Sequence, residues 1–172
     1  ARENLGFRDC FFTNDEAHQL KIAAIIRKYQ PEIVLTNAVH DRHPDHGKAS
    51  SLISASCFLA GLRRIETMLD DVSQPAWRPR VVYHFIQDYY IKPDFIVDIS
   101  TMMEKKLAVI QVFKSQFHDP ESVEPATVLS SPDFMERIRA RAREYGKVGD
   151  VEYGEGFTVE RMIGVRDLFD LI

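Results

Sequence analysis

A chain of 172 residues is long enough for one domain with a substantial core, and 45% hydrophobic and 28% charged residues are ordinary for a globular protein. A net charge of −4 gives no reason to expect binding to nucleic acid or to a membrane surface. No apolar run approaches the roughly 18 to 20 residues of a membrane span. Two cysteines, Cys10 and Cys57, are too few for a disulfide framework or a cysteine-rich zinc site, so we expect a reducing, cytoplasmic compartment.

The amino-terminal part is predicted to form a short strand, a helix and a second strand. The strand is expected over residues 5–12 and leads into a loop, where Arg8 and Asp9 either pair with each other or line a pocket. Asn14 is the predicted N-cap of a helix whose apolar residues recur at the helical period. The next strand, residues 32–36, lacks polar alternation, which is typical of a parallel strand covered on both faces.

Strands and helices continue to alternate along the rest of the chain. We expect helices over residues 45–60, from Thr101 (capped by Ser100) through Phe117, and from Pro132 (capped by Ser131) to Gly146. Strands are expected at 81–86 and 95–99, a loop at 118–130 and a tight turn at 152–157. This alternation predicts an α/β fold with a Rossmann-like, mostly parallel sheet flanked by helices. One domain over residues 1–172 is expected.

The loop of residues 39–47 concentrates the chemistry of the chain. Three of the six histidines fall here, at the carboxyl end of a strand and the entrance to a helix, where α/β sheets place ligands. The three-residue spacing of His43 and His46 lets both imidazoles converge, and Asp41 and Asp45 are close enough to hold a ring nitrogen. This pattern fits a catalytic zinc, although a polar helix cap with inert histidines would look the same.

The loop is nevertheless incomplete as a zinc site. A catalytic zinc normally has three protein ligands. The histidines outside this loop, His18, His84 and His118, are scattered and form no pair with the spacing of metal ligands. We expect His84 to be an ordinary strand residue. From the residues alone, the site is one ligand or more short.

The stretch Asp-Arg-His-Pro-Asp-His-Gly at residues 41–47 resembles the second motif of the LmbE-like, or PIG-L, zinc-dependent N-acetylglucosaminide deacetylases. More narrowly, the chain is similar to the bacillithiol-biosynthesis branch, which deacetylates N-acetylglucosaminyl malate. Supporting stretches lie at residues 92–100, 114–117 and 152–157, so the resemblance covers essentially the whole chain. The family's opening strand with a His-Pro-Asp-Asp motif has no match here, and we expect that the chain begins inside the family's fold, without its first strand and first helix.

The resemblance implies a role for each site residue. His46 would be the remaining zinc ligand, while a protonated His43, oriented by Asp45, would stabilise the oxyanion of the tetrahedral intermediate. Zinc would activate the attacking water, and the two other protein ligands and the general base would come from the absent motif. Sugar or malate contacts are expected from Arg42, Arg8 and Asp9. The substrate would be a small N-acetylglucosaminyl conjugate, and the protein a homo-oligomer.

Three functional hypotheses follow. The first is a zinc-dependent N-acetyl-sugar deacetylase, of which this chain alone would bind zinc weakly and have little activity. The second is a non-catalytic sugar-binding or oligomerisation remnant of the same fold. The third is a different metal hydrolase that uses the same loop. Absence of the first strand should also expose apolar surface on Ile33, Val34 and Leu35.

Overall fold

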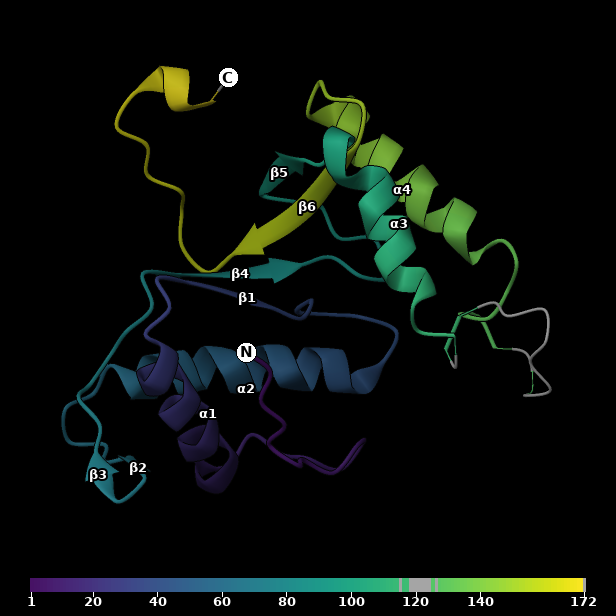
Figure 1. The fold of residues 1–172 in the computed structure, drawn as a ribbon. Coiled ribbons are helices and arrows are strands. Elements are labelled where there is room, and N and C mark those ends of the chain that lie inside the picture. Colours follow the sequence, from purple (N-terminus) through teal and green to yellow (C-terminus); the bar gives the residue numbers. More distant parts are fainter. Residues whose placement is uncertain (115, 118–124, 126, 172) are drawn as a thin grey trace. The chain divides into compact units, whose positions relative to one another are not determined.

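The computed structural model describes residues 1–114, 116–117, 125 and 127–171 (Figure 1). These residues form two compact units. The first comprises Ala1–Asp94 together with Phe157–Ile172, and the second comprises Phe95–Gly156. Within the described part of the chain, no helix combines the length and the apolar character needed to cross a membrane.

In the first unit, helix α1 (Glu16–Tyr29) precedes strand β1 (Ile33–Thr36). The helix begins one residue later than predicted, because Asp15 rather than Asn14 is the N-cap and accepts a hydrogen bond from the His18 amide at 2.9 Å. The predicted strand over residues 5–12 is wrong. This stretch forms a loop with a turn, in which the amides of Phe11 and Phe12 both donate to the Arg8 carbonyl.

A four-stranded sheet runs in the order β1-β4-β6-β5, with β4 at Val81–Phe85, β5 at Phe95–Asp98 and β6 at Gly154–Val159. β1 and β4 are parallel, with Ile33 opposite Val81, whereas β4 and β6 are antiparallel, with Tyr83 opposite Val159. The sheet is therefore mixed and not mostly parallel as predicted, because β6 returns along β4 in the opposite direction. Two short strands, β2 (Met68–Leu69) and β3 (Val72–Ser73), form a separate hairpin.

Helices α1 and α2 (Pro44–Ala60) form the layer beneath β1 and β4 (Figure 1). Their buried contact contains Ala23, Ile26, Cys57 and Ala60, and partly buried residues of both strands, Val34 among them, pack against it. The opposite side of β1 is open, since Ile33 is 57% and Leu35 is 58% exposed. The expected exposure of apolar surface on this strand is thus confirmed for its two outward-facing residues.

The second unit packs helix α3 (Met103–Gln111) and helix α4 (Phe134–Val148) around a core formed by Ile99, Met103, Leu107, Ala142 and Tyr153. A 3-10 turn, η1 (Ser100–Met102), replaces the first helical turn that was predicted, and α3 ends before Phe117. Helix α4 begins at Phe134, two residues later than predicted, with Asp133 instead of Ser131 as its N-cap, and it continues past the predicted end at Gly146. The predicted loop at residues 118–130 lies largely outside the described residues.

The predicted tight turn at residues 152–157 is also wrong, because most of this stretch belongs to β6. A Cβ at Gly154 would lie 2.6 Å from Cγ2 of Ile96 and 3.0 Å from the backbone nitrogen of Gly146. A Cβ at Gly146 would lie 2.7 Å from the carbonyl oxygens of Val151 and Glu152. These glycines therefore permit close approach of backbone and side chains. In the sequence alone, glycines that serve this purpose cannot be distinguished from glycines that mark a turn.

Candidate metal site

The site begins where the chain leaves β1 and enters α2. Pro44 occupies the first turn of α2, and His43 is the N-cap, whose ring nitrogen Nδ1 accepts a hydrogen bond from the Asp45 amide at 3.2 Å. The first amides of a helix have no partner within the helix, so this imidazole satisfies one of them. His46 lies one turn further along α2, and the two ring centroids are 5.2 Å apart.

A buried carboxylate holds His46. Nδ1 of His46 lies 2.5 Å from Oδ2 of Asp41, whose side chain is fully buried. The other oxygen of Asp41 accepts hydrogen bonds from the amides of Asp88 and Tyr89, both at 3.0 Å. Burial alone would raise the pKa of Asp41, but the hydrogen bonds from His46 and from backbone amides outweigh it and hold this pKa below the usual value. Asp41 is therefore an ionised acceptor at neutral pH.

This pairing determines the tautomer of His46. An ionised carboxylate can only accept, so Nδ1 of His46 carries the proton and Nε2 carries a lone pair. The His46 side chain is 31% exposed, which leaves its ring accessible. Carboxylate–histidine pairs of this kind orient histidine ligands in metal sites. His46 is thus preorganised to offer one nitrogen to a metal ion.

His43 has the opposite tautomer. Because its Nδ1 accepts from an amide, the neutral ring carries its proton on Nε2 and can donate from there. Asp45 contacts His43 through its backbone amide, whereas the expected role was for its carboxylate. The Asp45 carboxylate instead accepts from the Cys10 amide at 2.7 Å and from Nζ of Lys48 at 3.3 Å. It therefore ties the amino-terminal loop to the first turn of α2, while Nε2 of His43 is left to donate a hydrogen bond.

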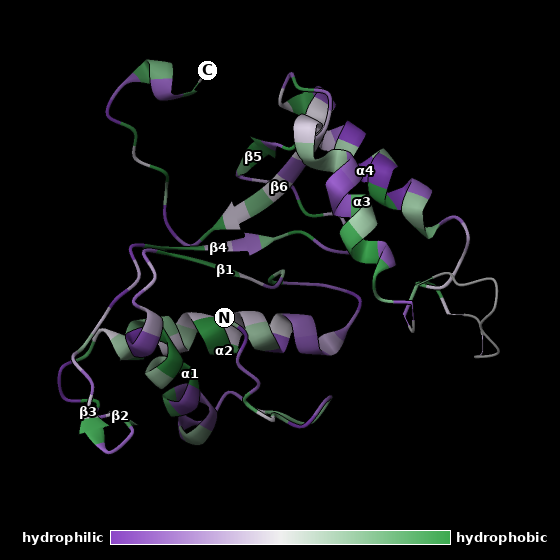
Figure 2. Ribbon diagram, in the orientation of Figure 1, coloured by the Kyte–Doolittle hydropathy of each residue, from purple (hydrophilic) through white to green (hydrophobic). Residues whose placement is uncertain are grey.

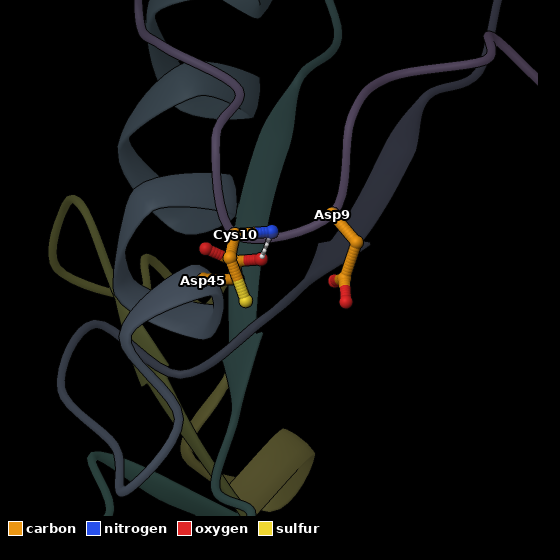
Figure 3. A group of neighbouring side chains, drawn as sticks. All are labelled: Asp9, Cys10 and Asp45. Atoms are coloured by element: carbon orange, nitrogen blue, oxygen red, sulfur yellow. Dashed lines mark hydrogen bonds between the residues drawn. The ribbon is translucent and has the colours of Figure 1, made fainter.

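Asp9, Cys10 and Asp45 form a group whose possible ligand atoms all lie within 4.8 Å of one another (Figure 3). The sequence pattern did not bring Cys10 into the site, because its partner Asp45 is 35 residues away. Burial, reinforced by the charges of Asp9 and Asp45, raises the pKa of the Cys10 thiol. Since a metal binds the thiolate, this environment disfavours Cys10 as a ligand.

The arginines predicted to contact substrate lie at the rim of the site. Nε of Arg42 lies 2.8 Å from a carboxylate oxygen of Asp88, and the guanidinium of Arg8 lies 4.2 Å from the ring centroid of Phe11. Both arginines are exposed. Of the two alternatives that the sequence left open for Arg8, pairing with Asp9 is not found among the described residues, and its guanidinium stacks on an aromatic ring instead.

Residues 87–90 form a second wall of the site, and the sequence pattern gave this loop no functional role. This loop follows β4, which is parallel to β1, so both strands deliver their loops to the same edge of the sheet. Its contacts with the first loop include Gln87 with Asn37 at 3.1 Å and the ring of Tyr89 with that of His40, 5.2 Å between centroids. The location of residues 87–90 directly after a predicted strand was the sequence feature that could have indicated their role.

His84 lies on β4 and is 3% exposed. Its Nδ1 is 3.0 Å from the Asn37 carbonyl oxygen and 2.9 Å from Oγ of Ser50, and its Nε2 is 3.0 Å from a carboxylate oxygen of Glu160. Both ring nitrogens are therefore occupied by protein groups. This supports the expectation that His84 is a strand residue and not a ligand.

The described residues supply only part of the ligand set that a zinc ion requires. His46 offers a neutral nitrogen with an oriented ring, which is the donor that zinc prefers. Among the residues that the structure describes, however, the group of three clustered ligand-type side chains is Asp9, Cys10 and Asp45, and His46 is outside it. The chain thus presents one strong ligand position, and two further protein ligands would be needed for a catalytic site.

No family model matches the chain. A diacetylchitobiose deacetylase from Thermococcus kodakarensis is 34% identical over 145 residues, which are 79% of this chain and 48% of that protein. The chain therefore spans about half the length of this curated relative.

Two solved structures show the same fold. The conserved protein TT1542 from Thermus thermophilus has a TM-score of 0.79 and 28% identity, covering 95% of this chain and 67% of that one. The N,N'-diacetylchitobiose deacetylase from Pyrococcus horikoshii, solved with its inhibitor MPG, has a TM-score of 0.70 and 29% identity, covering 96% and 60%. In both cases the likeness extends over almost the whole of this chain.

Proposed function

We propose that this chain, a homologue of the diacetylchitobiose deacetylases of the LmbE-like, or PIG-L, family, carries one half of the active site of a zinc-dependent N-acetyl-sugar deacetylase. The observation that carries this proposal is the bond between Asp41 and His46, which directs a lone pair of Nε2 outward beside a second histidine. A purely structural helix cap would not need a fully buried carboxylate to fix the tautomer of an accessible imidazole.

Each residue of this half has a distinct task. His46 would hold zinc through Nε2, and Asp41 would keep its ring in place. Zinc bound there would polarise the acetamide carbonyl and lower the pKa of a bound water to about 7. The Nε2–H group of His43 would donate to the carbonyl oxygen as negative charge develops on it. The other ligands and the general base are expected from a His-Pro-Asp-Asp segment outside this chain.

For the substrate we propose N-acetylglucosaminyl malate, as in bacillithiol biosynthesis. The motifs at residues 41–47, 92–100 and 152–157 support this branch. The malate carboxylates would need a guanidinium fork, and the exposed Arg42 and Arg8 are the candidates at the rim. Asp9, on the same loop as Arg8, is proposed to contact a sugar hydroxyl.

One observation favours a second candidate, a non-catalytic sugar-binding or oligomerisation remnant of the same fold. Within the described ranges, His46 lies outside the cluster of possible ligands, so the chain by itself offers zinc a single oriented histidine. If the parent gene lacks a His-Pro-Asp-Asp motif upstream of Ala1, this second candidate replaces the first.

The test compares two polypeptides: the 172-residue chain and an extended protein in which the parent's upstream segment precedes it. We expect the extended protein to bind zinc tightly and to release acetate from N-acetylglucosaminyl malate faster than from N,N'-diacetylchitobiose or simple acetamides. The chain alone should bind zinc weakly and show little activity. Near-stoichiometric, tight zinc in the chain alone would contradict the division of the site, and equal rates on all acetamides would contradict the proposed substrate.

A further inference from the structure

The loop of residues 87–90 presents an aromatic ring beside the metal site. The ring of Tyr89 packs against the imidazole of His40, with 5.2 Å between the ring centroids, and Tyr89 is nevertheless 44% exposed. His40 is exposed as well. Covering an aromatic ring is favourable, so a ring that is braced by a second ring and still faces solvent offers a ligand a ready apolar surface.

Polar contacts fix the backbone of this loop without using the ring. The amides of Asp88 and Tyr89 both donate to Oδ1 of Asp41, each at 3.0 Å. One residue earlier, the side chain of Gln87 accepts a hydrogen bond from that of Asn37 at 3.1 Å. Tyr89 thus contributes only its amide to the network that holds the loop, and its side chain is left for contacts outside it.

Asp41 joins the residue that carries this ring to the metal ligand. Its Oδ1 accepts from the Tyr89 amide, while its Oδ2 binds Nδ1 of His46. Because the Asp41 side chain is fully buried, one immobile carboxylate fixes the separation of the two residues. In an N-acetyl sugar the amide nitrogen is bonded directly to the pyranose ring. The ring of a substrate whose carbonyl lies at the metal must therefore contact the walls of the site.

The surroundings of the ring have the chemistry that a sugar requires. Figure 2 shows the chain changing from hydrophobic along β1 to hydrophilic in the loop that leads into α2. At the same rim the exposed pair of Arg42 and Asp88 presents a guanidinium and a carboxylate. A pyranose ring has an apolar face of C–H groups and an edge of hydroxyl groups, which match an aromatic ring bordered by planar polar groups. A wholly apolar ligand would leave these polar groups unpaired.

We propose that Tyr89, braced by His40, is the platform on which the N-acetylglucosamine ring of the substrate stacks. This inference rests on the proposed function, and it makes Tyr89 a residue that selects sugars over other acetamides. His40 is a positioning residue, which acts by holding the ring of Tyr89. The stacked face of the sugar takes no part in the chemistry, so the contact is equally strong in the ground state and the transition state. Its loss should therefore raise KM and leave kcat unchanged.

Steady-state kinetics of the extended protein test the platform. Tyr89→Ala removes the ring but keeps the amide that binds Asp41, so zinc affinity should not change. We expect KM for N-acetylglucosaminyl malate and for N,N'-diacetylchitobiose to rise by the same factor, about tenfold, with kcat nearly constant. The rate with N-acetylethanolamine, an acetamide without a sugar ring, should stay the same. Tyr89→Phe, which keeps the ring, should behave like the wild type.

Two further residues separate stacking from general effects of mutation. Tyr29, which is 46% exposed on α1, is the matched control for Tyr89, and Tyr29→Ala should leave both KM values unchanged. His40→Ala should raise them by less than Tyr89→Ala does, because the ring of Tyr89 remains but loses its brace. His40→Phe supplies another ring against Tyr89 and should restore them.

Saturation-transfer NMR of the extended protein with methyl N-acetyl-β-glucosaminide tests the platform without turnover. We expect the ring protons on one face of the sugar to receive the strongest saturation, and this signal to be lost in Tyr89→Ala and kept in Tyr89→Phe. A protein that releases no acetate would contradict the proposed function, and the NMR result would then decide on the platform by itself. Equal saturation in the wild type and Tyr89→Ala would overturn the platform. An unchanged KM for the sugars, or an equal loss with N-acetylethanolamine, would also overturn it.

Discussion

His46 and His84 both pair with a carboxylate, yet they lie in environments that give them different uses. Asp41 binds only Nδ1 of His46, and the side chain remains 31% exposed. His84 is 3% exposed and has protein partners at both ring nitrogens. A histidine becomes a metal ligand when one nitrogen is fixed and the other is left with an accessible lone pair. The site loop supplies this arrangement, and the centre of β4 does not.

The largest difference between the two histidines should appear in activity. In the extended protein, His46→Gln keeps a donor for Asp41 but removes the imidazole lone pair. We expect acetate release to fall by about a thousandfold, or on the order of 4 kcal/mol, with the free energy of unfolding nearly unchanged. Initial rates at saturating zinc, together with urea denaturation, check this. An activity within tenfold of the wild type would show that His46 does not hold the metal.

The reverse pattern is expected for His84. His84→Leu leaves the Ser50 hydroxyl and the Asn37 carbonyl without this partner in a buried place and removes a hydrogen-bond partner of the Glu160 carboxylate. The loss in the free energy of unfolding should be about 3 kcal/mol, measured by urea denaturation of the chain. Zinc affinity of the extended protein should not change. A loss below about 1 kcal/mol would mean that the network around His84 contributes little to stability.

A smaller effect is expected from the group that orients His46. Asp41→Asn retains the shape of the side chain and the acceptor for the backbone amides, but an amide no longer requires the proton on Nδ1 of His46. Zinc affinity of the extended protein should fall by about 10- to 100-fold, measured by competition with a chelating dye. Asp88→Asn, which alters the rim pair with Arg42, is the matched control and should leave zinc affinity unchanged.

The parts of the site that are close in sequence could be predicted, and the parts that are distant could not. His43, Asp45 and His46 lie within one turn of a helix whose start is marked by a proline, so their proximity follows from helical geometry. Asp88 reaches the loop only because β4 pairs with β1 in parallel. Ser50 and Glu160, 34 and 76 residues from His84, come together through packing alone.

The fold shows the same limit. Strands β1 and β4 could be predicted from their apolar and β-branched residues, and the start of helix α2 could be predicted from Pro44. The structure contains all three elements. β6 was mistaken for a turn because its glycines serve close packing against Ile96 and α4. The antiparallel return of β6 along β4 is a tertiary choice that local patterns do not specify, and it is what makes the sheet mixed.

The central claim, that His46 is held ready to bind a metal through Nε2, can be tested most directly by its tautomer. Long-range proton–nitrogen NMR correlations of the uniformly ¹⁵N-labelled chain at neutral pH, assigned with His46→Gln, report which nitrogen carries the proton. The predicted result is a neutral His46 ring protonated on Nδ1, and in the extended protein a zinc-induced shift of its Nε2 while His84 stays unchanged. A His46 ring protonated on Nε2, or one indifferent to zinc, would contradict the account.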